Sequence, residues 1–364
     1  MILIEPFVFA SAGAITLCVV YLASLFASNS RAVLDQPNDR SSHSNATPRI
    51  GGAAILAGWL AGVFVIAIFA EDADAAGKLG RLAICALLAF ALGLADDRLT
   101  FSPVWKFAGQ VVIAALFTTL FTPLQSAPLP FLGEVTMSPL WGIPITVVWI
   151  VGFMNAFNFM DGANGLAAGA AAVGLAWFAV MAGFAGAPAL AVAALLLAIA
   201  CAAFLPDNLV RGRLFMGDNG SMMLGFLIAA FAVLGAGWTG GRLSLLAAPV
   251  IFLPFLFDVA LTLVSRALRK QNILEAHREH LYQLLLRLGA SHASVAVIYM
   301  ALISLCAAAA IFMLTFPAPL HWLAPLLLSC VFAIGAAAIY RKAAPAGLLA
   351  RRDVEQDAPL SAAE

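Results

Sequence analysis

Four aspartates stand at the ends of long apolar segments, and they are the residues in this chain best suited to chemistry. Asp96 and Asp97 are adjacent, Asp161 lies in MDGANG, and Asp218 lies in FMGDNGS. Carboxylate oxygens suit Mg²⁺ and Mn²⁺, and acids grouped beside an apolar phase repel one another unless a cation intervenes. Mg²⁺ usually binds one or two carboxylates and completes its shell with water and substrate phosphates. The acids therefore predict Mg²⁺ (or Mn²⁺) and a substrate that carries phosphate.

Basic and amide side chains accompany these acids. Asn155 and Asn158 are three residues apart and share one helical face. Glycines beside Asp161 and Asp218 would let the backbone approach a ligand closely. Phosphate groups are bound by Arg, Lys and backbone N–H donors, and the basic residues that flank the acids are Arg98, Lys106, Arg211, Arg213, His277, Arg278 and His280.

Two features are open to more than one interpretation. Asp258 lies inside an apolar segment eight residues before Arg266, or about 12 Å along a helix. An acid within a membrane is a candidate functional residue, and the alternative is an acid that packs helices near the interface. His277 and His280 have the spacing of a metal pair. Because no cysteine or third ligand is near, we favour phosphate contacts or an amphipathic loop over zinc.

The composition indicates the elements that must position these residues. Of the 364 residues, 63% are hydrophobic and 10% are charged, against about 45–50% and about 25% in soluble proteins. A soluble protein could not cover so much apolar surface, and a disordered chain would be less hydrophobic and more charged. The net charge is zero, so nothing in it points to nucleic acid. We therefore predict an all-α, polytopic membrane protein.

Eleven apolar segments are long enough, or nearly so, to cross a bilayer as helices. We expect one transmembrane catalytic domain over residues 1–342 and a disordered tail over residues 343–364. The predicted spans are 6–27, 50–70, 79–95, 103–122, 141–158, 165–184, 187–204, 219–238, 244–265, 293–315 and 320–340.

The distribution of Lys and Arg predicts the orientation. With the N-terminus outside, 16 of the 19 basic residues lie in inside loops or in the C-terminal tail, which is then cytoplasmic. All the loops that carry the candidate residues share that face. The competing interpretation, a transporter of lipid-linked sugars or small metabolites, predicts a polar path through the membrane and motifs on both faces, and the sequence shows neither.

The loops resemble those of the polyprenyl-phosphate N-acetylhexosamine-1-phosphate transferases. This integral-membrane family includes the bacterial undecaprenyl-phosphate N-acetylglucosaminyl-1-phosphate transferase and the phospho-N-acetylmuramoyl-pentapeptide transferase. The resemblance runs in order through most of the chain. Its marks are D-x-P-x-x-R-S-x-H-x(4)-P-R-x-G-G over 35–52, LADDR, the Lys106/Gln110 helix, NAFNFMDGANGL, RLFMGDNGS and HREHLYQ.

The resemblance implies attack by undecaprenyl phosphate on a UDP-N-acetylhexosamine, with release of UMP and with Mg²⁺ or Mn²⁺ as cofactor. It implies a bacterial inner (plasma) membrane protein with a cytoplasmic active site, and we consider a homodimer. Asp218 and Asp97 would bind the metal, Lys106 phosphate and Phe215 the uracil. The implied catalytic set is Asp96, Asp97, Asp161, Asp218 and His280, and the implied substrate-binding set is His43, Arg49, Lys106, Asn155, Asn158, Phe215, Asp258, His277 and Arg278.

Two departures from the family pattern bear on the substrate. Many relatives have a second aspartate where this chain has Asn164, which removes one charge. The chain also reads His280–Leu281–Tyr282–Gln283, where the N-acetylglucosaminyl enzymes carry a tighter histidine cluster. This variant resembles the branch that initiates O-antigen synthesis and uses deoxy-N-acetylhexosamines as well, so the donor sugar stays open.

Overall fold

Helices make up nearly all of the described structure. The computed structural model describes residues 6–30, 33–35, 46–69, 73–130, 132–272 and 277–349. The helices are α1 (Pro6–Ser28), α2 (Gly51–Phe69), α3 (Ala73–Leu99), α4 (Pro103–Leu120), α5 (Pro139–Phe159), α6 (Leu166–Ala185), α7 (Pro188–Leu205), η1 (Pro206–Val210), α8 (Gly217–Trp238), α9 (Ala247–Ile251), α10 (Leu253–Leu268), α11 (Leu281–Arg287), α12 (His292–Phe312), η2 (Ala318–Leu320) and α13 (Leu323–Ala343).

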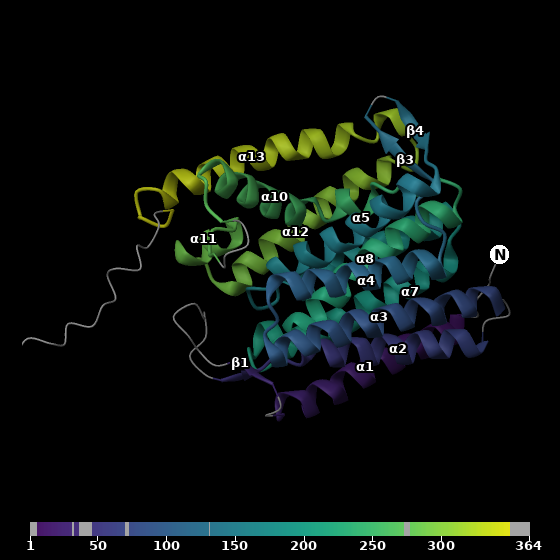
Figure 1. The fold of residues 1–364 in the computed structure, drawn as a ribbon. Coiled ribbons are helices and arrows are strands. Elements are labelled where there is room, and N and C mark those ends of the chain that lie inside the picture. The colour runs from purple at the N-terminus through teal and green to yellow at the C-terminus, as the bar shows by residue number, and fades with distance from the viewer. Residues whose placement is uncertain are drawn as a thin grey trace, which may run out of the picture.

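Two short antiparallel strand pairs complete the described elements. β1 (Leu34–Asp35) pairs with β2 (Thr47–Pro48), and β3 (Ser126–Leu129) pairs with β4 (Gly133–Thr136). Figure 1 shows the two pairs at opposite ends of the helix bundle. We call these ends the β1–β2 end and the β3–β4 end.

Ten of the described helical segments are long and apolar enough to cross a membrane. The protein is therefore an all-α, multi-pass membrane protein, as the composition predicts. The ninth predicted span, 244–265, is not one helix, because α9 ends at Ile251 and α10 begins at Leu253. Pro254 explains the break, since proline has no backbone N–H and clashes with the carbonyl four residues earlier.

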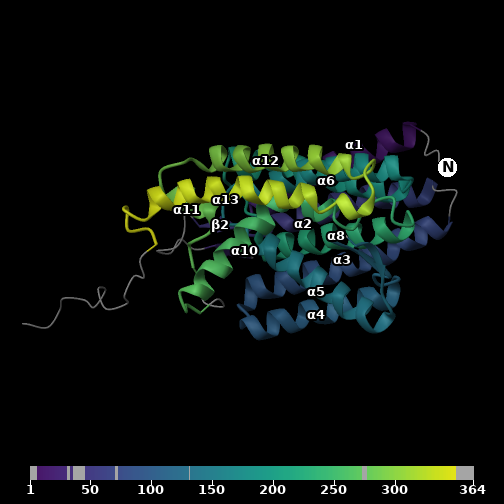
Figure 2. The ribbon, with the colours of Figure 1, turned by 90° about the horizontal axis from the view of Figure 1, so that it is seen from above.

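The long helices lie side by side, and α1 and α13 place the chain ends at opposite ends of the bundle (Figure 1). α1 begins at the β3–β4 end, and α13 finishes at the β1–β2 end. α8 is the most buried of the candidate spans and α13 the least. Seen from above, α13 lies nearest the viewer, beside α12 and in front of the other helices (Figure 2).

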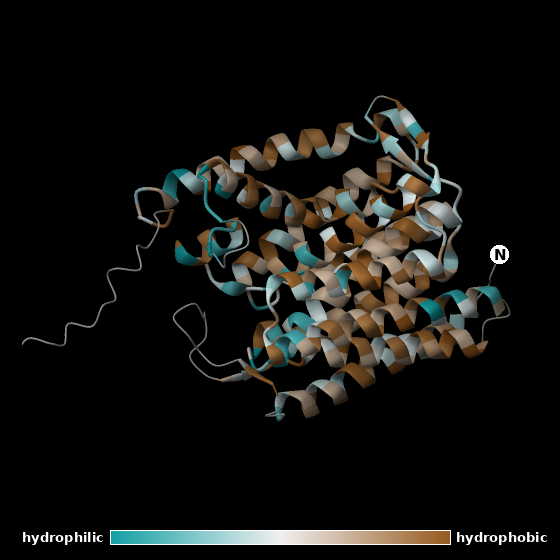
Figure 3. Ribbon diagram, in the orientation of Figure 1, coloured by the Kyte–Doolittle hydropathy of each residue, from teal (hydrophilic) through white to brown (hydrophobic). Residues whose placement is uncertain are grey.

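Hydrophilic residues gather towards the ends of the bundle, and many lie at the β1–β2 end (Figure 3). Small residues let the helices approach closely there. A Cβ at Gly93 of α3 would lie 2.3 Å from the carbonyl oxygen of Asp218. Only glycine permits this approach, which brings the end of α3 against the start of α8. The predicted tail falls largely on residues 350–364, which lie outside the described residues.

Candidate active site

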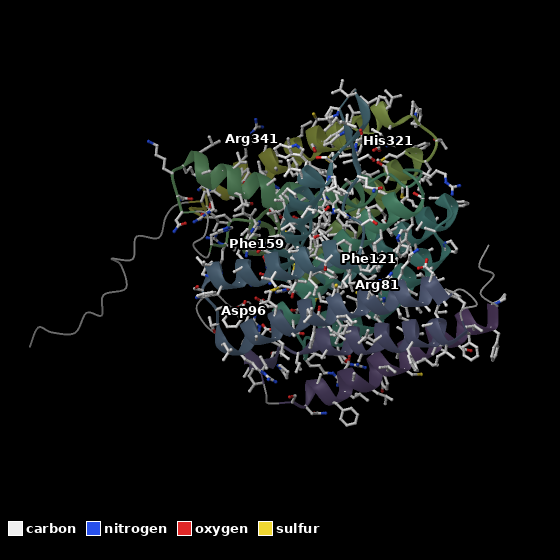
Figure 4. All side chains as sticks on the ribbon, turned by 45° about the vertical axis from the view of Figure 1, so that its right-hand side comes forward. Arg81, Asp96, Phe121, Phe159, His321 and Arg341 are labelled. Carbon is white, nitrogen blue, oxygen red and sulfur yellow. The ribbon has the colours of Figure 1, made fainter. Side chains whose placement is uncertain are left out.

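Five segments from three distant parts of the sequence meet at the β1–β2 end. They are the end of α3 with Asp96 and Asp97, the start of α4, the end of α5, the turn 160–165, and the start of α8 with Asp218. Figure 4 shows Asp96 and Phe159 towards this end of the bundle, away from Arg81 and Phe121. The helix directions therefore bring the predicted acids to one face.

Lys106 of α4 lies at the centre of this cluster. Its Nζ is 2.6 Å from Asp218 Oδ2 and 2.9 Å from Asp96 Oδ2, and it donates to Asn158 Oδ1 at 3.0 Å. The lysine side chain is only 18% exposed. A largely buried ammonium group thus offsets two carboxylates, and the repulsion expected among the acids is relieved in part by the protein itself.

Asp97 anchors the first turn of α8. It accepts from the backbone N–H groups of Asp218 (3.1 Å) and Asn219 (3.0 Å) and from Asn219 Nδ2 (2.7 Å). Its side chain is 0% exposed. The first N–H groups of a helix have no partner within the helix, so a carboxylate is a favourable acceptor for them. The oxygens of Asp97 thus hold the start of α8, including Asp218, in position; its binding of a metal stays a prediction.

The segment that precedes α2 runs beside the segment that precedes α8. Phe215 N–H donates to Pro48 O at 2.8 Å, Gly51 N–H to Phe215 O at 2.8 Å, and Gly52 N–H to Met216 O at 2.9 Å. Nη2 of Arg49 consequently lies 3.4 Å from Asp97 Oδ1 and 3.5 Å from Asp218 Oδ1. Residues 48–52 of the first sequence motif therefore pack against the fifth motif, and Arg49 adds a second cation to the cluster.

Asp161 differs from the other acids, because its carboxylate has no hydrogen bond or ion pair among the described residues. Burial, followed by the charge of Asp218, raises the pKa of this carboxyl group well above its usual range, although Arg49 opposes the shift. Asp161 and Asp218 thus repel each other, and the Asp161 carboxylate has no hydrogen-bond donor among the described residues. This pair could receive a cation.

The carboxylate oxygens of Asp161 and Asp218 are suitable ligands for Mg²⁺. In the described part of the chain, no three His, Cys, Asp or Glu side chains form a ready-made metal centre. Mg²⁺ does not need one, since it commonly binds through one or two carboxylates and keeps its other positions for water and phosphate. Asp218 is 20% exposed and reachable, whereas Asp97 is not.

The two asparagines of α5 face neighbouring helices. Asn158 accepts from Lys106 and donates to Ser221 Oγ at 3.1 Å. Asn155 donates to Gln110 Oε1 at 2.6 Å, and Gln110 is fully buried. Asn155 therefore lies one turn deeper than Asn158 and links α5 to α4, whereas the family resemblance implied that both contact the substrate.

The histidine segment packs against the end of α5. The rings of His280 and Phe159 are stacked with centroids 5.9 Å apart, and those of His277 and His280 are 4.9 Å apart. Burial and the neighbouring His280 lower the pKa of His277 to about 4, so its ring is neutral at pH 7. Arg278 lies between the two histidines and is half-buried. The predicted group is brought together, with His280 itself nearly inaccessible.

Asp258 is fully buried and holds α11. It accepts from Leu281 N–H at 2.8 Å, Tyr282 N–H at 3.2 Å and the Tyr299 hydroxyl at 2.6 Å, and His280 Nδ1 is 3.3 Å away. The sequence left a choice between a substrate contact and a packing acid. The geometry favours the second, because Asp258 offers its oxygens to the protein.

Several polar residues at the site carry no obvious signal in a single sequence. They are the partners of loops and helix ends and include Asn208, Asn219, Ser221, Tyr282 and His292. The pattern G-D-N-G-S could have drawn attention to Asn219 and Ser221. Phe215 is half-buried beside these groups. The predicted substrate contact His43 lies outside the described residues.

Comparison with known proteins gives a consistent result. Residues 80–236 match the family model described as "Glycosyl transferase family 4". The chain is 34% identical over 269 residues to "Probable undecaprenyl-phosphate N-acetylglucosaminyl 1-phosphate transferase" of Bacillus subtilis, which covers 73% of this chain and 74% of the relative. It is 31% identical over 304 residues to "Decaprenyl-phosphate N-acetylglucosaminephosphotransferase" of Mycobacterium tuberculosis, covering 76% and 75%. It is 29% identical over 250 residues to "Phospho-N-acetylmuramoyl-pentapeptide-transferase" of Staphylococcus epidermidis, covering 64% and 75%.

Proposed function

The chain belongs to glycosyl transferase family 4, the polyprenyl-phosphate hexosamine-1-phosphate transferases, and on that premise we propose that it transfers N-acetylhexosamine-1-phosphate from a UDP-sugar to undecaprenyl phosphate. UMP leaves, and a lipid-diphosphate-sugar forms. The observation that carries the proposal is the group around Lys106, in which two carboxylates, an asparagine and a lysine meet at one end of a membrane bundle. A lipid phosphate and a water-soluble nucleotide sugar can both reach such a position.

The charges at the site suit phosphoryl transfer. This reaction depends mainly on positioning and on neutralising phosphate charge, and Lys106 and Arg49 supply two cations beside the acids. Asp218 and Asp161 would hold Mg²⁺, which supplies charge stabilisation to the diphosphate and the leaving UMP. Asp97 would act indirectly by fixing the backbone of Asp218.

Asp96 is the member of the adjacent pair that we assign to the lipid phosphate. Its Oδ2 contacts Lys106 and its Oδ1 accepts from Phe101 N–H at 2.9 Å, and its side chain is partly exposed. A phosphomonoester has a second pKa near 6, so the attacking lipid phosphate is largely dianionic at pH 7. Asp96 therefore need not act as a base, and its role is to hold Lys106, whose ammonium group would orient the phosphate. Inversion or retention at phosphorus would distinguish direct attack from a covalent aspartyl intermediate.

We further propose that the β1–β2 end faces the cytoplasm of a bacterial inner membrane. The support is the excess of Lys and Arg in the loops that lie at this end. The product would then initiate O-antigen or another cell-envelope polysaccharide. The segment around Tyr282 is where we expect selection among UDP-N-acetylhexosamines, deoxy sugars included.

The decisive experiment measures UMP release by the purified protein with undecaprenyl phosphate, Mg²⁺ and a panel of UDP-N-acetylhexosamines. We expect release with at least one donor and its loss in Asp218→Asn. Asp74→Asn is a matched control, because Asp74 lies at the other end of α3 and pairs with Lys78 there. No UMP from any donor, or full activity in Asp218→Asn, would refute the proposal.

A further inference from the structure

The turn that carries Asp161 is held by side chains from three other elements. The Tyr282 hydroxyl of α11 donates to Phe159 O at 3.0 Å. Asn208 Oδ1 accepts from Gly165 N–H at 2.6 Å, and His292 Nδ1 accepts from Asn164 N–H at 3.1 Å. The Asp161 carboxylate has no hydrogen-bonded partner in the described structure, and the backbone N–H of Asp161 donates to Asn158 O at 3.4 Å. The contacts of the turn therefore define where this carboxylate lies.

Tyr282 is the contact that joins this turn to the histidine segment. Its side chain is 1% exposed, and its ring is nearly parallel to that of His280, with centroids 5.9 Å apart. Asp258 holds its backbone N–H at 3.2 Å and is itself held by Tyr299. Burial raises the pKa of the Tyr282 hydroxyl, which therefore stays protonated and donates at any working pH.

The fit between Tyr282 and Gly162 is close. A Cβ added at Gly162 would lie 2.1 Å from the Tyr282 hydroxyl oxygen and 3.0 Å from the ring carbon that bears it. Gly162 is not among the described residues with positive φ. The phenolic oxygen, rather than the backbone conformation, is therefore what excludes a larger residue at this position.

We propose that Tyr282 is a positioning residue that sets the location of Asp161 relative to Asp218 and couples it to the histidine segment. The hydroxyl fixes the last carbonyl of α5, two residues before Asp161, and its oxygen occupies the space above Gly162. Asp258 keeps α11 in register for both contacts. This role rests on the proposed transferase function, in which Asp161 shares the metal.

Tyr282→Phe tests the catalytic consequence, because it removes one oxygen and leaves the ring. Loss of the hydrogen bond to Phe159 O releases the turn that carries Asp161, so we expect kcat to fall about tenfold, which corresponds to about 1.36 kcal/mol. The Mg²⁺ concentration for half-maximal rate should rise, with an unchanged KM for the lipid phosphate. Tyr340→Phe, a half-buried tyrosine of α13, is the control. Normal kcat and Mg²⁺ response in Tyr282→Phe would overturn the proposal.

A double-mutant cycle tests the contact without any activity. Gly162→Ala should lower Tm in the wild-type background, and much less in the Tyr282→Phe background, because the 2.1 Å clash is then absent. Gly152→Ala on α5 meets nothing within 4 Å and should not lower Tm in either background. Additive shifts of Gly162→Ala and Tyr282→Phe would overturn the proposed contact. If the wild-type protein releases no UMP, the transferase proposal is refuted, but the double-mutant cycle still tests the contact between Tyr282 and Gly162.

Discussion

The two adjacent aspartates of α3 should respond differently to the same substitution. Asp97→Asn keeps the size of the side chain and removes its charge, but one carboxylate oxygen becomes an NH₂ group. That group would face donors, because Asn219 approaches Asp97 Oδ2 with both its N–H and its Nδ2. Asp96→Asn can keep its bond from Phe101 N–H through the remaining oxygen and loses the charge beside Lys106.

The magnitude follows from the contacts that change. In Asp97→Asn a buried N–H loses its acceptor, at about 1–3 kcal/mol, and the charge at the helix N-terminus, worth about 0.3–2 kcal/mol, is lost. The relief of repulsion with Asp218 and the loss of attraction to Arg49 act in opposite directions. We therefore expect a loss of about 3 kcal/mol, or about 6 °C in Tm at about 2 °C per kcal/mol.

The assay compares Tm in detergent with UMP release measured below the transition of every variant. We expect Asp97→Asn to lower Tm, and Asp96→Asn to lower kcat at nearly wild-type Tm. If Asp97→Asn keeps the wild-type Tm, or if Asp96→Asn is the less stable of the two, the division of roles between the aspartates is refuted.

Three further perturbations have defined outcomes. Lys106→Met leaves its carboxylate partners uncompensated and should lower kcat by about 100-fold or more, which UMP release measures; a loss below tenfold would contradict its central role. His277 has its pKa lowered to about 4 in the folded protein, so stability is fully present above pH 6.5 and falls between pH 6.5 and 4. His277→Gln should flatten the decline of Tm over that range, and an identical pH profile would contradict the assignment. Gly52→Ala would set a Cβ 2.2 Å from Asn219 Oδ1 and should reduce the folded yield, measured by size-exclusion chromatography, whereas Gly80→Ala meets nothing within 4 Å and should not.

The spans are predictable because hydropathy is summed over neighbours in sequence. Ten of the eleven predicted spans correspond to one long helix each, with ends that differ by a few residues. The exception, 244–265, shows the limit of this approach. A hydropathy sum does not register that Pro254 removes a hydrogen bond, so a broken helix has the same signal as a continuous one.

The residue types at the site can also be predicted from the sequence, because acids, amides and lysine are unusual beside apolar segments. Their partners are not. Asp97 binds residues more than 120 positions away, and Asn208 holds a turn 43 positions earlier. Such pairs depend on how helices pack, and a single chain gives no local sign of them.

The sequence by itself determined that this is a multi-pass helical membrane protein with an acid-rich set of loops, because composition and spacing are properties of the chain alone. Only the tertiary structure decided what each acid does. Neighbours on a helix point about 100° apart, so Asp96 faces Lys106 while Asp97 turns to the first amides of α8. Asp258 is likewise turned to α11, and Asp161 is left without a donor. Direction and partner, which the packing of the helices sets, separate an anchoring carboxylate from one that can receive a cation.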